Sequence, residues 1–266
     1  MNDNKDIFQE KPAEKEESVG EFFKTAILAI LLALFIRTFF FEPFNIPSGS
    51  MLPTLQIGDY LFVSKTSYGY SQHSFPFGLA DFDGRIMDKE PERGDVIVFK
   101  LPTNPSIDYI KRLVGMPGDT VQVKGGRLYI NGAIVDREPV GMRRLQSAEG
   151  GNENMMEYIE TLPGGILHTI YEESDNEALD NTQEYRVPQG HYFMMGDNRD
   201  NSQDSRVQDL VGFVPHDNLV GRADILFFSL DQTASIFKPW TWFTAIRYSR
   251  IFDRIGPARP PEEQGA

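Results

Sequence analysis

Two serines and a lysine are the residues of this sequence whose surroundings favour nucleophilic chemistry. Ser48 and Ser50 flank Gly49 in the stretch EPFNIPSGSMLPTL, residues 42–55. Three prolines stiffen this stretch, because each ring fixes φ and removes a backbone donor. Glycine lets another chain approach closely, so a hydroxyl beside it is a candidate nucleophile. Ser-Gly-Ser is also common in ordinary turns, and the stretch alone does not decide between the two interpretations.

A nucleophilic serine needs a base, and the best candidate is Lys111. It lies in the apolar run IDYIKRLV, residues 107–114, which has the composition of a strand. Because neighbouring side chains in a strand point to opposite faces, Lys111 points inward if Ile110 points outward. Burial lowers the pKa of a lysine amine, and a neutral amine can accept the Ser50 proton. The alternative is a solvent-exposed lysine on an edge strand, which is the commoner position for lysine.

A third polar segment, GDNRDNSQDSR at residues 196–206, first suggests a calcium loop but does not fit one. Arg199 occupies the third ligand position, and the sixth-position glycine and twelfth-position glutamate are missing. Its alternating acids and arginines favour a rigid, self-paired loop in which Ser202 could hydrogen-bond a neighbouring group. The four histidines are scattered, which weighs against a Ser-His-Asp triad without excluding one.

The overall composition argues against several classes of protein. A formal net charge of -13 disfavours a nucleic-acid partner, which would need a basic face. The absence of cysteine excludes disulfides, thiol nucleophiles and cysteine-ligated zinc. The sequence contains neither a Walker loop nor a GxSxG elbow. We therefore expect no metal and no cofactor in the chemistry.

An apolar segment, residues 22–41, directly precedes the serine stretch and predicts a transmembrane helix. Its charge-free core, 25–36, is short for a span, but Lys24 and Arg37 near its ends can reach the interface. A cleaved signal peptide is the alternative. The long acidic tail before the segment and the lack of an A-x-A site after it favour a retained anchor. The lysines before the segment weakly favour a cytoplasmic N-terminus.

Short apolar runs separated by Gly and Pro turns follow residue 57 and predict a mainly β fold. Asn131-Gly132 predicts a hairpin turn with two positive φ angles. We expect antiparallel sheets that form a barrel-like catalytic domain from residues 42–123 and 186–235. The predicted strands include residues 60–63, 96–99, 107–114, 120–123, 192–195 and 225–230.

Residues 124–185 interrupt this domain, and we expect them to form a β-rich cap away from the chemistry. Within them, residues 138–184 carry 11 Asp or Glu against 2 Arg, which favours a solvated, partly disordered insertion. Residues 1–21 and the Pro- and Glu-rich end are also predicted to be disordered. The last segment, 236–266, begins with aromatic and basic residues. These suit either a membrane interface or a terminal helix packed on the domain.

Four sequence boxes resemble those of bacterial type I signal peptidases in order and spacing. They are IPSGSMLPT at 46–54, RGDVIVFK at 93–100, DYIKRLVGMPGD at 108–119 and GDNRDNSQDSR at 196–206. The anchor ending in RTFFFEPFN is similar too. The resemblance covers about residues 22–230 without the insertion. It implies a membrane-anchored serine endopeptidase that removes N-terminal signal peptides from exported preproteins after Ala-x-Ala-like sites.

The resemblance also implies roles for individual residues. Ser50 would be the nucleophile and Lys111 the general base, while Ser48 and the Ser50 backbone N–H would form the oxyanion hole. Ser202 would orient the Lys111 amine. The loop around it would be scaffolded by Asp197 with Arg199 and by Asp204 with Arg206. The positions that match the lining of two small substrate pockets are Phe44, Ile46, Leu61, Tyr109 and Ile110.

The implied location is the bacterial inner membrane, crossed once, with a cytoplasmic N-terminus and an extracytoplasmic catalytic domain. The expected partners are secretory preproteins and membrane lipid, and extended substrate is expected to add to a strand edge at 108–110. Two alternatives remain. Self-cleaving repressors share a Ser/Lys dyad, but the anchor and the lack of a DNA-binding domain count against them. A membrane-tethered, non-enzymatic β module that binds extended peptides would make Ser50 and Lys111 coincidental.

Overall fold

The computed structural model describes residues 19–75, 82–146, 152–231, 233 and 241–256. The predicted disorder of residues 1–18 and 257–266 lies outside this part of the chain, and the same prediction for residues 19–21 is wrong, because they belong to the first helix. The helices and strands are α1 (Val19–Phe39), β1 (Phe41–Asn45), β2 (Asp59–Ser64), β3 (Val96–Leu101), β4 (Asn104–Gly115), β5 (Thr120–Lys124), β6 (Arg127–Ile130), β7 (Ala133–Ile134), β8 (Asp136–Gln146), β9 (Asn152–Leu162), β10 (Ile166–Glu172), β11 (Tyr185–Arg186), β12 (His191–Met195), β13 (Val214–Pro215), β14 (Leu219–Ser229) and α2 (Trp242–Ala245). Short 3-10 helices are η1 (Lys65–Ser67), η2 (Gln72–Ser74), η4 (His216–Asn218) and η6 (Tyr248–Arg250).

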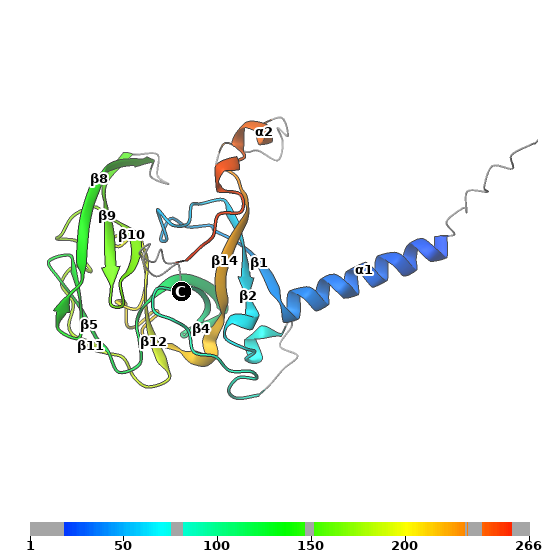
Figure 1. Cartoon of the computed structure of the whole chain (residues 1–266), viewed down its shortest axis with the longest axis horizontal. Coiled ribbons are helices and arrows are strands. Elements are labelled where there is room, and N and C mark those ends of the chain that lie inside the picture. Colours follow the sequence, from blue (N-terminus) through cyan, green and yellow to red (C-terminus); the bar gives the residue numbers. More distant parts are fainter. Residues whose placement is uncertain (1–18, 76–81, 147–151, 232, 234–240, 257–266) are drawn as a thin grey trace, which may run out of the picture.

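Helix α1 projects away from the β-rich body (Figure 1). It is long and apolar enough to cross a membrane, and none of its residues is buried against the rest of the protein. It begins at Val19 and ends at Phe39, so it is shifted toward the N-terminus relative to the predicted range 22–41. The helix stops there because Phe41 already pairs with Ser64 at the start of β1.

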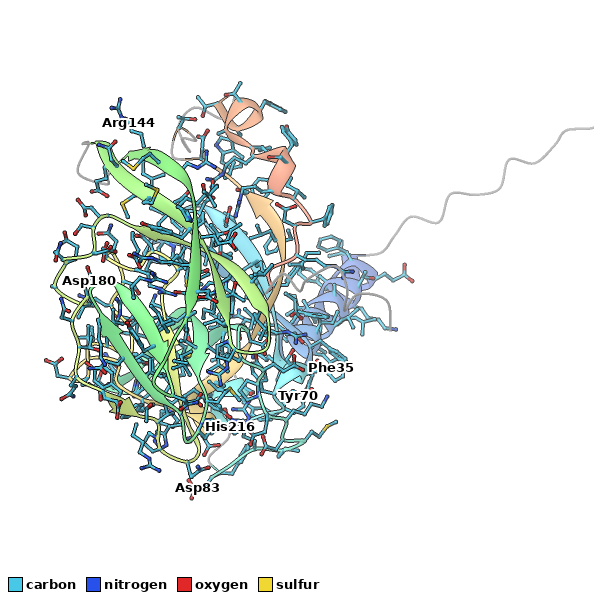
Figure 2. All side chains as sticks on the ribbon, turned by 60° about the vertical axis from the view of Figure 1, so that its left-hand side comes forward. Phe35, Tyr70, Asp83, Arg144, Asp180 and His216 are labelled. Carbon is cyan, nitrogen blue, oxygen red and sulfur yellow. The ribbon has the colours of Figure 1, made fainter. Side chains whose placement is uncertain are left out.

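The end of α1 is tied to the first sheet by polar and aromatic contacts. Arg37 forms an ion pair with Glu42 at 2.9 Å. The Tyr70 hydroxyl donates to the Phe39 carbonyl at 2.7 Å, and the two rings meet edge to face. Figure 2 shows Tyr70 and Phe35 at this junction, where Phe35 also packs on Phe39. The helix therefore joins the domain through several contacts in addition to the chain itself.

A seven-stranded antiparallel sheet forms the body, in the order β1-β2-β14-β3-β4-β12-β13. The prediction of a mainly β protein with antiparallel sheets and one N-terminal helix is confirmed. Within the described residues, however, the sheet does not close into a barrel, since β1 and β13 remain its edges. β13 is two residues long, and its Pro215 has no N–H with which to pair a further strand.

Strand β3 shows how this sheet separates two cores. Val96 and Val98 belong to one buried cluster, whereas Ile97 and Phe99 belong to another. Successive residues of a strand face opposite sides of the sheet, so both faces of β3 are covered. A third cluster joins the ends of β4 and β12 to β5 and β6.

The insertion and the residues that flank it, 120–123 and 186, form two further sheets, which in Figure 1 lie on the side of the body away from α1. One is four-stranded, in the order β11-β5-β6-β7, and the other is three-stranded, in the order β10-β9-β8. The predicted hairpin turn is confirmed between β6 and β7, where φ is 54° at Asn131 and 77° at Gly132. Figure 2 shows Arg144 near the outer end of β8.

The expectation of a solvated, partly disordered insertion is wrong for its described residues. Three long strands occupy it, and Glu160 and Glu172 are among its buried side chains. These acids can be buried because each has an arginine partner, Arg199 for Glu160 and Arg137 for Glu172. Residues 147–151, between β8 and β9, lie outside the described part.

The described part of the C-terminal segment packs back on the large sheet. Arg250 forms an ion pair with the buried Asp59 at 2.5 Å, and Ile255 joins the first core cluster. Phe243 and Tyr248 remain exposed. The segment thus has the packed character of a terminal element and also presents aromatic side chains to its surroundings.

Candidate active site

Ser50 and Lys111 are 61 residues apart in the chain and meet in the structure. Lys111 Nζ donates to Ser50 Oγ at 2.7 Å and to the Ile110 carbonyl at 3.0 Å. Ser50 is 8% exposed and Lys111 is 4% exposed. Once the amine is neutral, this contact has the length required for it to accept the serine proton.

Strand β4 buries the lysine because it lies inside the sheet. Its first residues, 104–108, are exposed, whereas 111–115 are all buried between β3 and β12. Lys111 is opposite Ile97 in the register with β3. The prediction that Lys111 points into the protein is confirmed, but Arg112 is buried as well, so both faces of β4 are covered here.

Burial lowers the pKa of Lys111 to about 8, because the charged amine has lost its water. Asp204 and Asp197 act in the opposite direction and raise this pKa, while Arg206 lowers it. Burial is the largest of these effects. Roughly a tenth of the amine is therefore neutral at pH 7.

The chain around Ser50 is fixed by the side chains that follow it. Met51 and Leu55 are fully buried in the core shared with β2 and β3, and the Leu55 N–H donates to the Met51 carbonyl at 2.8 Å. Ser48 is exposed, and its Oγ lies 3.4 Å from Ser50 Oγ. The structure thus places Ser48 beside the candidate nucleophile.

Loop 196–206 interlocks with the serine stretch through two residues that the sequence analysis did not single out. The Asn198 N–H donates to the Ser50 carbonyl at 3.1 Å, and its side-chain amide donates to the Gly49 carbonyl at 3.1 Å. At Gly196 a Cβ would lie 2.2 Å from Ser202 Oγ and 2.6 Å from the Ser50 carbonyl oxygen. Only glycine fits there, because Ser202 and the backbone of Ser50 occupy the space of a side chain.

The charges of this loop pair differently from the prediction. The Asp204–Arg206 ion pair is present at 2.8 Å. The predicted Asp197–Arg199 pair is wrong: Asp197 pairs at 2.7 Å with Arg112 of β4, and Arg199 pairs with an acid of the insertion. The chain bends at both residues, so their side chains reach different neighbouring elements.

The predicted hydrogen bond between Ser202 and the Lys111 amine is not present among the described atoms. Ser202 is buried beside Gly196, and its hydroxyl helps to lower the pKa of Asp204 through a side-chain hydrogen bond. The amine of Lys111 is instead held by the Ile110 carbonyl. Within the described residues, no group of three or more His, Asp or Glu side chains is placed to hold a metal ion.

The five predicted pocket residues differ in exposure. Ile46 and Leu61 are buried in the first core cluster, and Phe44 and Ile110 pack against it with part of their surface exposed. The Tyr109 ring lies 5.4 Å from Lys111 Nζ. A cavity of about 370 Å³ lies at the junction of α1 and β1, and Phe44 is the one predicted pocket residue in its described lining, beside residues such as Arg37, Lys65 and Asp108.

A serine hydroxyl bonded to a buried lysine is the arrangement of a serine hydrolase that uses lysine as its base. Sequence comparison leads to the same class, because the family described as "Signal peptidase, peptidase S26" matches residues 19–228. The chain is 39% identical over 256 residues to the signal peptidase I of Rickettsia typhi, covering 90% of this chain and 95% of that protein. It is 41% identical over 243 residues to that of Rickettsia conorii, with 85% and 89% covered.

A solved signal peptidase I from Enterococcus faecalis V583 is 27% identical, with a TM-score of 0.30 over 50% of this chain and 97% of that one. The family assignment depends on the sequence matches. This chain belongs to the signal peptidase family, peptidase S26, and is a serine endopeptidase.

Proposed function

We propose that this protein is a membrane-anchored endopeptidase that removes N-terminal signal peptides from exported preproteins after Ala-x-Ala-like sites. In this proposal Ser50 is the nucleophile and neutral Lys111 is the general base. The observation that carries it is the 2.7 Å contact between Lys111 Nζ and Ser50 Oγ in a buried site. The family and the lowered pKa of Lys111, about 8, support the same assignment.

The proposed reaction has two halves. Neutral Lys111 takes the hydroxyl proton while Ser50 Oγ bonds to the scissile carbonyl carbon, and the resulting oxyanion is stabilised by the Ser48 hydroxyl and the Ser50 N–H. The lysine ammonium then protonates the leaving amine as the C–N bond breaks, which leaves an acyl-enzyme. Water, deprotonated by the same lysine, hydrolyses this ester and restores Ser50.

Loop 196–206 is proposed to shape the surroundings of the amine. Asp204 raises the pKa of Lys111, against the larger effect of burial, and Arg206 holds Asp204 in place. We assign to Ser202 the orienting role that the sequence predicted. Its hydroxyl is buried against Gly196 next to the serine stretch, and it interacts with Asp204, the acid that raises the pKa of Lys111.

Substrate is proposed to bind in an extended form. The outer edge of β1 is unpaired in the sheet, and Phe44 of β1 and Asp108 of β4 line one hollow. A peptide laid there could pair with backbone groups at 108–110. The side chains Phe44, Ile46, Leu61, Tyr109 and Ile110 would leave room for small residues only, which is how a pocket selects alanine.

Helix α1 is proposed to anchor the enzyme in the bacterial inner membrane, with the N-terminus in the cytoplasm and the catalytic domain outside. Its length, its apolar sequence and its lack of burial support this arrangement. Membrane lipid would then be one partner and secretory preproteins the other. We divide the remainder into a catalytic domain, 42–123 and 186–235, an insertion, 124–185, and a C-terminal segment, 236–266.

The test is cleavage of a precursor with an Ala-x-Ala site in detergent, comparing wild type with Ser50→Ala and Lys111→Ala. Both variants should stay folded and lose cleavage, whereas the exposed-lysine control Lys124→Ala should keep it. Near-normal activity of Lys111→Ala would place the base elsewhere. If wild type binds such peptides but cuts none, the chain is a peptide-binding β module.

A further inference from the structure

The insertion contacts the catalytic loop directly, contrary to the expectation that it lies away from the chemistry. The Tyr171 N–H of β10 donates to the Asp197 carbonyl at 2.8 Å, and the Arg199 N–H donates to the Tyr171 carbonyl at 2.9 Å. Between these two bonds, the Asn198 N–H donates to the Ser50 carbonyl at 3.1 Å. The loop is therefore a bridge with the insertion on one side and the nucleophile on the other.

A buried ion pair fastens this bridge to the insertion. Glu160 of β9 is 1% exposed, and its two carboxylate oxygens accept from the two terminal nitrogens of Arg199, which is 3% exposed. The Arg199 carbonyl in turn accepts from Arg206 Nη2 at 2.5 Å. Arg206 is bonded to Asp204, whose carboxylate accepts from the Gly196 N–H at 3.0 Å. A continuous chain of bonds thus runs from Glu160 to the residue that packs against Ser50.

The charges facing Glu160 indicate that its partner is Arg199. His168 Nε2 of β10 lies 3.2 Å from its carboxylate, but burial lowers the pKa of His168, so this ring is neutral at physiological pH. Arg112 lowers and Asp197 raises the pKa of the same ring. Although burial raises the pKa of Glu160, Arg199 and His168 lower it to about 2. Glu160 is therefore ionised and neutralises Arg199.

We propose that Glu160 is a positioning residue, through which the acidic insertion holds loop 196–206 against the Ser50–Lys111 dyad. This inference deepens the proposed function and depends on it. Glu160 touches neither reacting atom, and its effect passes through Arg199 and the loop. Two hydrogen bonds to one carboxylate fix the orientation of an arginine guanidinium group, and Arg199 can therefore hold the loop that carries it in one position.

The first variant is Glu160→Gln, which keeps the shape of the side chain and removes its charge. Arg199 would then lose the carboxylate that binds both of its terminal nitrogens, with Glu172 and Asp197 as the remaining acids that act on it, and the loop would shift toward solvent. A misplacement of about 1 Å at a catalytic group can cost on the order of 10²-fold in rate. We expect kcat at pH 7 to fall by roughly that factor, with a smaller change in KM.

The dependence of this loss on pH separates positioning from simple destabilisation. The groups around the Lys111 amine are Asp197, Asp204, Arg206 and the Tyr109 ring. If the loop moves, water reaches the amine and the pKa of Lys111 rises from about 8 toward its ordinary value. The rate deficit of Glu160→Gln should then shrink between pH 7 and pH 10. A loss of folded enzyme alone would not move the midpoint of the pH–rate profile.

The matched control is Glu157→Gln on the same strand. Glu157 pairs with Arg143, which is 53% exposed, so this substitution should change kcat and its pH profile little. Glu160→Asp keeps the charge but shortens the side chain, and should show an intermediate kcat with the same direction of pH shift. Thermal unfolding shows whether Glu160→Gln folds. If it does not, the kcat and the pH shift of Glu160→Asp test the positioning role instead.

A Glu160→Gln enzyme within twofold of wild type, or one whose lost rate is matched by an equal loss of folded enzyme in thermal unfolding, would overturn the inference while leaving the dyad intact. If wild type fails to cleave, or cleaves without Lys111, the proposed function itself fails. The two failures are therefore distinguishable in one set of measurements.

Discussion

The rate of signal-peptide cleavage should rise with pH, because the proposed base acts only in its neutral form. Burial lowers the pKa of Lys111 from 10.5 to about 8. This shift corresponds to about 3 kcal/mol of lost stabilisation of the charged amine. With a pKa near 8, roughly a tenth of the amine is neutral at pH 7, half at pH 8 and nine-tenths at pH 9. Without the shift, less than about a thousandth would be neutral at pH 7.

We therefore expect kcat/KM to rise about tenfold between pH 7 and pH 9 and then to level off. The assay is cleavage of a short quenched-fluorescence peptide with an Ala-x-Ala site, in detergent and overlapping buffers. Thermal unfolding at each pH confirms that the enzyme stays folded. kcat/KM is the useful quantity, since its pH profile reports groups of the free enzyme.

Two results would refute this reasoning. A midpoint near 6.5 that disappears in a histidine variant would make a histidine the base; His216, which pairs with Asp88 at 2.6 Å, is one variant to test. A midpoint above pH 10 would mean that burial leaves the lysine unperturbed. In either case the contact between Lys111 and Ser50 would not be a working dyad.

Three further substitutions test the energetics of the site. The folded-state pKa of Lys111 lies below its unfolded value, so its burial lowers the free energy of unfolding below pH 8, and this cost disappears as the pH rises toward 10.5. Lys111→Met should therefore stabilise the inactive protein by up to about 3 kcal/mol at pH 7 and by little at pH 10.5. Urea unfolding at the two pH values measures the difference. Gly196→Ala should abolish cleavage and lower the free energy of unfolding by about 1–3 kcal/mol, because a Cβ there meets a backbone oxygen. Gly256→Ala, whose Cβ meets nothing within 4 Å, should change neither cleavage nor the free energy of unfolding. Asp197→Asn should lower the free energy of unfolding by about 3–5 kcal/mol, because it leaves Arg112 buried without its counter-charge; a loss below about 1 kcal/mol would mean that the pair is solvated.

Local chemistry predicted the parts of the site that depend on near neighbours in the chain. The apolar residues around Lys111 indicate a buried strand, and the structure buries Lys111 together with residues 112–115, while 107–108 are exposed. Asn131-Gly132 indicated its turn because few other pairs accept two positive φ angles. The contact between Ser50 and Lys111 was inferred from their chemistry before any geometry was known, and it is present.

Long-range charge pairing could not be predicted in the same way. Asp197 and Arg199 are close in sequence, but their partners come from 85 and 39 residues away, from β4 and β9. Only the three-dimensional arrangement of strands brings Arg112 and Glu160 to the loop. A count of acids in the insertion also hides which of them are buried, because buried and solvated carboxylates look alike in composition.

The short connection from α1 to β1 fixes the distance between the end of the helix and the candidate nucleophile. Only Phe40 separates the helix from β1, and its carbonyl accepts from the Lys65 N–H at 3.0 Å. The five residues of β1 extend about 17 Å, and Ser50 follows a few residues later. In the proposed membrane arrangement, this length sets the height of the nucleophile above the lipid. Of several small-residue sites in one precursor, the enzyme should cut the one presented at that height, so the choice of bond is set by distance as well as by side-chain size.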